Sequence, residues 1–134
     1  MKLRIKGNSI RLRLGRSEVV RLATEGILEE FTDFGPGSAR FGYTIHATFQ
    51  EPSVTARFAD GRLVVRVPAI ELHMWANGDQ VGIEASQRID DDGYEMLRIL
   101  VEKDFQCLHG DDGEEETDED AYPNPQLQST PIDD

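Results

Sequence analysis

Apolar and polar residues alternate with a period of two at the start of the chain. Every second residue is apolar before Gly7-Asn8, and again after it as far as Leu14. Alternation on both sides of a Gly/Asn pair predicts a β-hairpin that buries one face. The apolar spacing becomes helical after Ser17, and Gly26 is a typical residue to end such a helix.

The remaining pattern predicts a second run of elements in the same order as the first. Two strands complete the first run: Ile27–Phe34 and Phe41–Phe49, with a turn at Gly35–Ser38 between them. The second run is a hairpin of Val54–Phe58 and Leu63–Val67 around Asp60-Gly61, a helix from Pro68 to Asn77, and strands at Val81–Ser86 and Leu97–Val101.

The two runs superpose without a gap when they are offset by 53 residues, which brings Leu3–Ala23 onto Ala56–Ala76. Over this stretch the apolar residues fall on the same alternate positions, and the turn and the start of the helix coincide. This agreement favours a tandem duplication. Beyond the helices Ile45 would meet Arg98, so a slip of one residue is expected between them. The alternative is that any two hairpin–helix units look alike.

A single ββαββ unit of this length cannot cover its own apolar face, so two units are expected to share one core. The sequence therefore predicts a mainly β fold with two short helices, arranged as a closed β-barrel with pseudo-two-fold symmetry. The predicted domain spans residues 1–104, with units at about 2–50 and 55–103.

The charge distribution separates this domain from the C-terminal residues. The chain of 134 residues has a formal net charge of −12, and residues 105–134 hold ten acidic and no basic residues. Such a block repels itself and buries little apolar surface, so an acidic, largely disordered tail is expected. A disulfide scaffold is excluded because Cys107 is the only cysteine. Without an apolar signal region or a membrane-length apolar run, a cytoplasmic protein is expected.

Three segments resemble the AbrB/MazE family of swapped-hairpin domains. Gly7–Leu14 is similar to the family's Gly-Asn-Ser-x-x-Val-Arg-Ile-Pro signature, Val64–Pro68 to its end, and Gly78–Glu84 to the Gly-Asp-x-Val-x-Ile strand after the helix. The resemblance covers roughly residues 2–86 and implies that both exchanged hairpins lie in one chain. It also implies DNA binding through basic hairpin residues. The whole chain in addition resembles a small bacterial family with no assigned function.

Basic residues concentrate in the two predicted hairpins. Residues 2–14 carry five basic residues and no acid, and residues 54–67 carry three basic residues and one acid. A clustered cationic face is typical of a surface that binds DNA or another polyanion, although solvated strands also carry such charges. The candidate polyanion-binding residues are Arg4, Asn8, Arg11, Arg13, Arg57, Arg62 and Arg66. The resemblance implies the same role for all of these except Arg11 and Arg62.

The acidic tail has three interpretations. It could compete with DNA for the cationic face, it could bind a protein partner with Tyr122 as the aromatic anchor, or it could only increase solubility. The AbrB/MazE resemblance implies the second role, since acidic C-terminal tails of that family engage toxins.

No motif for catalysis, cofactor binding or a structural metal is present in the sequence. The P-loop, Gly-x-Gly-x-x-Gly and Gly-x-Ser-x-Gly patterns are missing, and Cys107 with His109 supplies too few ligands for zinc. Glu29-Glu30 and Asp90–Asp92 are interpreted as solvated carboxylates. The expected function is a non-enzymatic binding module, a DNA-binding regulator without cofactor. The alternative is a protein–protein interaction module that acts through the tail without nucleic acid.

Overall fold

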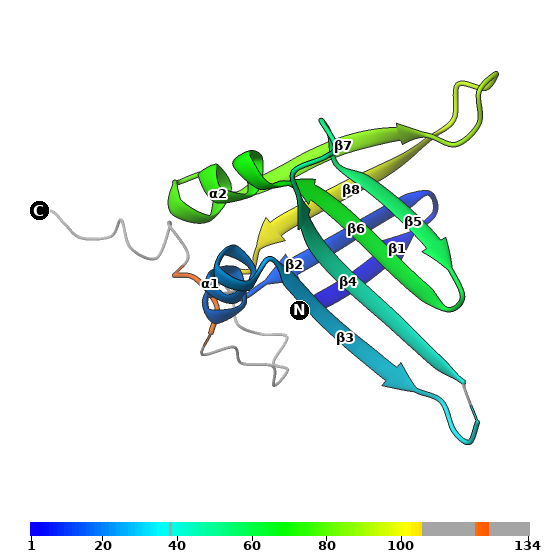
Figure 1. Ribbon diagram of the computed structural model, residues 1–134, viewed down its shortest axis with the longest axis horizontal. Helices are drawn as coiled ribbons and strands as arrows, with labels where there is room; N and C mark the ends of the chain where they lie inside the picture. Colours follow the sequence, from blue (N-terminus) through cyan, green and yellow to red (C-terminus); the bar gives the residue numbers. More distant parts are fainter. Residues whose placement is uncertain (38, 106–119, 124–134) are drawn as a thin grey trace, which may run out of the picture.

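The computed structural model describes residues 1–37, 39–105 and 120–123, which form two four-stranded sheets and two helices (Figure 1). Sheet 1 has the strand order β1 (Lys2–Lys6), β2 (Ser9–Leu14), β8 (Met96–Lys103), β7 (Gly82–Arg88). Sheet 2 has the order β3 (Ile27–Asp33), β4 (Arg40–Thr48), β6 (Arg62–Pro68), β5 (Thr55–Ala59). The helices are α1 (Arg16–Glu25) and α2 (Ala69–Asn77). The predicted mainly β class with two short helices is confirmed.

The two halves of the chain exchange hairpins. Strand β2 pairs in parallel with β8, and β6 pairs in parallel with β4. Each sheet therefore combines the first hairpin of one half with the last hairpin of the other. Both helices lie at one end of the molecule, and the two sheets extend from there in different directions (Figure 1).

Among the described residues no strand ladder joins the two sheets, so the predicted closed barrel is not found. Side chains and the chain terminus connect the edges instead. The Gln87 amide on β7 accepts from the Ala56 N–H at 2.7 Å and donates to the Ala56 carbonyl at 2.9 Å. At the other edge the Met1 ammonium donates to Glu30 at 2.8 Å and also to Glu18. Edge strands joined by side chains leave two sheets rather than one continuous barrel.

The pairing register identifies equivalent positions in the two halves. Three such pairs are Leu12 and Val65, Leu28 and Ile83, and Ile45 and Val101. Their offsets are 53, 55 and 56 residues. The expected slip of one residue is therefore wrong. Two extra residues lie between α2 and β7, and one more in the β7–β8 loop.

The core lies between the sheets and beneath the helices. Trp75 on α2 and its equivalent Leu22 on α1 are both fully buried, as the sequence comparison predicts. The Trp75 indole N–H donates to the Val81 carbonyl at 3.0 Å, which satisfies its polar atom. Val20 on α1, by contrast, is an apolar residue that is 64% exposed.

The described residues 120–123, here called the return segment, pack against the start of α1 (orange in Figure 1). The Asp120 carboxylate accepts from the Ser17 N–H at 3.1 Å and from the Ser17 hydroxyl at 2.9 Å, and its carbonyl accepts from the Arg16 N–H at 2.8 Å. Asp120 thus caps the helix. A Cβ on Gly15 would lie 2.2 Å from the Asp120 carboxylate, so this close approach requires glycine.

The return segment attaches Tyr122 to the folded part of the chain. The Tyr122 N–H donates to the Asp104 carbonyl at 2.7 Å, and the Tyr122 and Phe105 rings lie 5.7 Å apart. Tyr122 is half-buried against the core, so part of its ring packs within the molecule, and its role as an anchor for a partner stays a prediction. The folded domain also continues past residue 104 to include residues 120–123. The acidic residues 111–119 and the C-terminal residues 124–134 lie outside the described part of the chain.

Candidate polyanion-binding face

Along the strands of sheet 1, apolar and charged residues alternate, so they lie on opposite faces of the sheet. The inner face carries buried residues such as Leu12, Ile99 and Val101. Residues directly opposite one another in the ladder share a face, so the outer face can be read from the register. Seven basic residues lie on this outer face, here called the cationic face: Lys2, Arg4, Lys6, Arg11, Arg13, Arg88 and Arg98.

Basic residues on the cationic face are cross-strand neighbours. Arg4 on β1 lies directly opposite Arg11 on β2. Ser9 on β2 lies between Lys6 on β1 and Arg98 on β8. Like charges directly opposite each other destabilise a sheet. The fold therefore tolerates repulsion on this face.

Few carboxylates offset these charges. Glu102 on β8 accepts from the Arg13 Nε at 2.7 Å and lies 3.4 Å from the Arg11 Nε, so one carboxylate serves two guanidinium groups. Lys2 donates to Asp104 at 2.9 Å. Within the described residues, Arg4, Lys6, Arg88 and Arg98 belong to no ion pair, and Arg88, at the end of β7, donates only to the Asp91 and Gly93 carbonyls at 3.3 and 3.4 Å.

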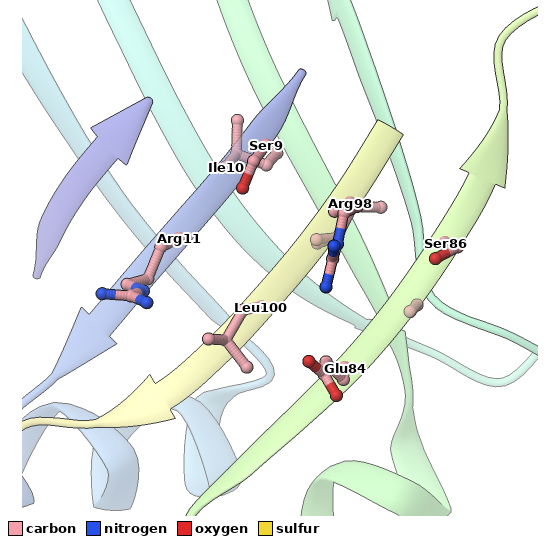
Figure 2. Close-up of a pocket in the computed structure, with 9 residues that line it drawn as sticks. Ser9, Ile10, Arg11, Glu84, Ser86, Arg98 and Leu100 are labelled. Atoms are coloured by element: carbon pink, nitrogen blue, oxygen red, sulfur yellow. The ribbon is translucent and has the colours of Figure 1, made fainter. Parts of the chain in front are cut away.

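A shallow groove of about 480 Å³ crosses the cationic face. Figure 2 shows its side chains on three neighbouring strands: Ser9 and Arg11 on β2, Arg98 and Leu100 on β8, and Glu84 and Ser86 on β7. Two guanidinium groups and two hydroxyl groups line the groove, with Arg11 extending towards β1 and away from Arg98 (Figure 2), and both kinds of group donate hydrogen bonds to phosphate oxygens. Glu84 is the acidic side chain among the residues that line the groove.

The second predicted hairpin lies on the other sheet. Arg57, Arg62 and Arg66 are on the outer face of sheet 2, where Arg62 pairs with Glu29, and Arg66 lies 3.6 Å from Glu51. The structure therefore divides the seven candidates. Arg4, Arg11 and Arg13 share the cationic face, Asn8 lies in the turn beside it, and the other three do not join them.

Asn8 is engaged by the fold. Its side-chain amide donates to the Met96 carbonyl at 3.4 Å, and its own carbonyl accepts from the Arg98 N–H at 3.0 Å. The β1–β2 turn is thereby tied to β8. Asn8 positions the turn next to the cationic face.

Sequence reasoning missed four members of the cationic face: Lys2, Lys6, Arg88 and Arg98. Arg98 is distant in sequence from the first hairpin and reaches it only because β8 pairs in parallel with β2. The hairpin exchange implied by the family resemblance was the one available signal, since it places the last strand of one half beside the first hairpin of the other.

The adjacent carboxylates Glu29 and Glu30 do not form an acid–base pair, because they face opposite sides of β3. Glu29 contacts Arg62 on the outer face, whereas Glu30 accepts from the Met1 ammonium and from the Tyr43 hydroxyl at 3.2 Å. Burial, together with the Glu30 charge, raises the pKa of Tyr43. For the Met1 ammonium, burial opposes protonation, but the bonds to Glu18 and Glu30 raise its pKa overall.

The described residues contain no cluster of three potential metal ligands. Cys107 and His109, the candidate metal ligands of the sequence, lie outside the described residues. No helix in the described part of the chain is long and apolar enough to cross a membrane.

Comparison with known proteins gives one match. A model described as a family of unknown function, DUF7009, matches residues 1–126. This range includes the return segment as well as both sheets. No curated protein and no solved structure matches the chain.

Proposed function

The chain belongs to DUF7009, a family of unknown function, and we propose that it is a non-enzymatic protein that binds the phosphate backbone of duplex DNA through its cationic face. The observation that carries the proposal is the set of cations without carboxylate partners. In the described chain Arg4, Lys6 and Arg98 belong to no ion pair, although they neighbour other cations. Repulsion between these cations destabilises the free protein, and phosphate groups bound against them reduce that repulsion.

The geometry of a strand suits a regularly charged ligand. Alternate residues on a strand are about 6.8 Å apart, and neighbouring strands are about 4.8 Å apart. Cations on β1, β2 and β8 therefore form a grid rather than a single point charge. A duplex carries about one negative charge per 1.7 Å of its axis, so a grid of this kind contacts several phosphates at once.

The residue types on the cationic face favour a duplex over a single strand. Single-stranded nucleic acids are typically held by aromatic side chains that stack on the bases. The outer positions of β1, β2, β7 and β8 in the described structure are basic, acidic, small polar or aliphatic, and none is aromatic. The face can contact a phosphate backbone but offers no stacking platform.

The formal net charge of −12 is concentrated at the end of the chain. At an ionic strength of 0.1 M, charges interact over a Debye length of about 10 Å. Ten of the acidic residues lie at or beyond residue 111, so the net charge is not evenly distributed along the chain.

The proposal includes the AbrB/MazE-like interpretation of the fold, with two duplicated units around a pseudo-two-fold axis. Support comes from the identical pairing scheme of the two halves and from the exchange of hairpins between them. In this interpretation the molecule is a DNA-binding regulator. Contact with DNA is nevertheless carried by one sheet rather than by both hairpins, because the arginines of the second hairpin are largely ion-paired.

A salt series with a labelled 20-base-pair duplex tests the proposal by fluorescence anisotropy. We expect binding at low salt, with log affinity falling against log salt at a slope of about −3 to −5, the value for three to six phosphates. The double variant Arg4→Gln/Arg98→Gln should bind at least tenfold more weakly, with a slope smaller by about two units. The matched control Arg21→Gln/Arg40→Gln removes the same charge from α1 and sheet 2 and should bind like the wild type. Absence of binding at 20 mM salt, or equal losses in both variants, would contradict the proposal.

A further inference from the structure

Four residues that lie side by side across sheet 1 carry hydrogen-bond donors and no carboxylate. The register places Lys6 on β1 opposite Ser9 on β2, Ser9 opposite Arg98 on β8, and Arg98 opposite Ser86 on β7. These four residues are here called the donor row. Neighbouring members are about 4.8 Å apart, and Figure 2 shows Arg98 between the two serines. Three members of the donor row line the groove of about 480 Å³.

No side chain of the described residues engages the donor row. Lys6 and Arg98 belong to no ion pair there, and the Ser9 and Ser86 hydroxyl groups form no hydrogen bond within the described part of the chain. The two neighbouring rows, nearer the helices, differ because each includes a carboxylate, Glu84 in one and Glu102 in the other. The donors of the donor row are therefore available to a ligand.

The equivalent row of sheet 2 has a different composition. The register aligns it as Ala59 on β5, Arg62 on β6, Gly42 on β4 and Phe31 on β3. Its one cation, Arg62, pairs with Glu29, and a Cβ at Gly42 would lie 2.6 Å from the Phe31 ring. Since the shared fold accepts this sparse row, the donor row of sheet 1 is not a requirement of the fold.

The donor row complements a terminal phosphate better than a phosphate within a backbone. Ammonium, guanidinium and hydroxyl groups all donate hydrogen bonds to phosphate oxygens. A phosphate monoester carries a charge of about −1.5 to −2 at pH 7 and has three free oxygens. A backbone phosphate is a diester with a single negative charge and fewer free oxygens. Two cations and two hydroxyl groups in one row therefore match the monoester more fully.

The surroundings of the donor row are acidic on one side. Beyond it the sheet continues only into the β7–β8 hairpin, whose tip projects past the β1–β2 turn (Figure 1). The exposed carboxylates of this tip are those of Asp90, Asp91, Asp92 and Glu95. A polyanion that extended in this direction would be repelled by them.

The opposite side of the donor row is cationic. Next to Lys6 and Ser9 along the strands lie Arg4 and Arg11, which face each other across the β1–β2 ladder. A strand of nucleic acid is therefore favoured on this side of the donor row and disfavoured on the other. This arrangement suits a strand that ends at the donor row.

We infer that the donor row binds the terminal phosphate at the end of a DNA duplex, while the adjoining backbone phosphates lie against Arg4 and Arg11. This inference rests on the proposed DNA binding and restricts it to duplex ends that carry a phosphate. Arg98 and Lys6 supply the charge, and Ser9 and Ser86 supply further donors to the free oxygens of the monoester.

The test compares three 20-base-pair duplexes of one sequence, each with an internal fluorescent label, by anisotropy in 50 mM salt. Their ends carry 5′-hydroxyl, 5′-phosphate or 3′-phosphate groups. We expect the 5′-phosphate duplex to bind at least about fivefold more tightly than the hydroxyl duplex, because its ends add charge and acceptor oxygens. An equal gain for the 3′-phosphate duplex would support a terminal phosphate on either strand end, and no gain would identify the 5′ end as the ligand.

The variant Ser9→Ala/Ser86→Ala tests the position of the terminal phosphate. It removes two donors but no charge, so the preference for the phosphorylated duplex should fall below about twofold while the salt slope stays unchanged. The matched control Ser53→Ala removes an exposed hydroxyl group before β5 and should keep the full preference. A preference that survives in the double variant would place the terminal phosphate elsewhere and overturn the inference.

Two further outcomes separate this inference from the proposed function. Equal affinity for hydroxyl and phosphorylated ends, with both duplexes bound, would refute the inference and leave the proposed DNA binding intact. Absence of binding by every duplex would contradict the proposed function and the inference together. Inorganic phosphate, titrated alone at constant ionic strength, should bind at least about 100-fold more weakly than the phosphorylated duplex, since it makes no contact with Arg4 and Arg11. Equally tight binding of inorganic phosphate would identify a free phosphate as the ligand, against the inference.

Discussion

Sheets 1 and 2 have the same strand arrangement and similarly apolar inner faces, but their outer faces differ. On sheet 2, Arg62 pairs with Glu29, Arg66 lies 3.6 Å from Glu51, and Arg40 lies 3.5 Å from Asp33 and 4.0 Å from the Phe31 ring. Arg57 on sheet 2 belongs to no ion pair of the described residues, whereas on sheet 1 this holds for Arg4, Lys6 and Arg98 together. Since the shared fold requires only the inner pattern, the uncompensated charge of sheet 1 is a separate feature, and we assign the function to it.

The largest expected effect comes from removing three charges from one sheet at a time. The variant Arg4→Gln/Arg11→Gln/Arg98→Gln should weaken duplex binding about 100-fold or more at 50 mM salt, because it removes about three phosphate contacts. The matched variant Arg57→Gln/Arg62→Gln/Arg66→Gln should weaken it less than fivefold. Fluorescence anisotropy with one duplex measures both. Equal losses would show that both hairpins bind DNA and that the difference between the sheets has no functional meaning.

A smaller effect should follow from removing a carboxylate from each sheet. Glu102→Gln frees both Arg11 and Arg13 from their shared partner, so we expect about threefold to tenfold tighter duplex binding at low salt. Glu29→Gln frees Arg62 on sheet 2 and should leave the affinity unchanged. The same anisotropy assay applies, and circular dichroism checks that both variants fold. Tighter duplex binding by Glu29→Gln but not by Glu102→Gln would indicate that sheet 2, rather than sheet 1, contacts the DNA.

Stability should respond in opposite directions on the two sheets. Arg4→Gln removes repulsion with Arg11 directly across the ladder and should raise the free energy of unfolding by about 0.2–1 kcal/mol in 20 mM salt. Arg62→Gln removes the partner of Glu29, and because both side chains are partly exposed the loss should stay below about 1 kcal/mol. Urea denaturation at 20 and 500 mM salt measures both changes, and the gain for Arg4→Gln should disappear at high salt. A loss of stability in Arg4→Gln would mean that its charge is already compensated.

The smallest effect concerns one position on the inner faces. Lys103 on sheet 1 is buried where sheet 2 has Ala47, and its ammonium donates to the Gly78 carbonyl at 2.9 Å, with the Trp75 ring 5.7 Å away. Burial lowers the pKa of Lys103 from 10.5. The folded protein therefore releases this proton before the unfolded chain does, and stability should rise with pH between the lowered pKa and 10.5. The difference in unfolding free energy between the wild type and Lys103→Met, measured by urea denaturation across this range, should show that rise. A flat difference would contradict it.

The sequence predicts those parts of the structure that local patterns determine, namely the hairpins and the helices. Alternation with a period of two and the turn pairs Gly7-Asn8 and Asp60-Gly61 locate the hairpins, because each hairpin closes on its own neighbours. The helices lie close to their predicted bounds for the same reason. The burial of Trp75 follows from its alignment with Leu22.

Contacts that depend on the exchange between halves could not be predicted in this way. The ion pair of Arg62 with Glu29 joins the second hairpin to a strand of the first half, and Arg98 joins the cationic face only across the parallel β2–β8 ladder. The docking of Tyr122 depends on the space above Gly15, which no sequence pattern near Tyr122 reveals. Candidates chosen by charge alone therefore included three arginines that the fold places on the other sheet.

Amide chemical-shift mapping of the full chain during titration with a duplex tests the central claim most directly. If sheet 1 alone binds phosphates, the perturbed amides and arginine Nε–H signals will belong to β1, β2 and β8, with Arg4, Arg11 and Arg98 among the largest changes. The signals of β4, β5 and β6 will stay within error. Perturbations spread equally over Arg57, Arg62 and the cationic face, or no perturbation at low salt, would contradict the account.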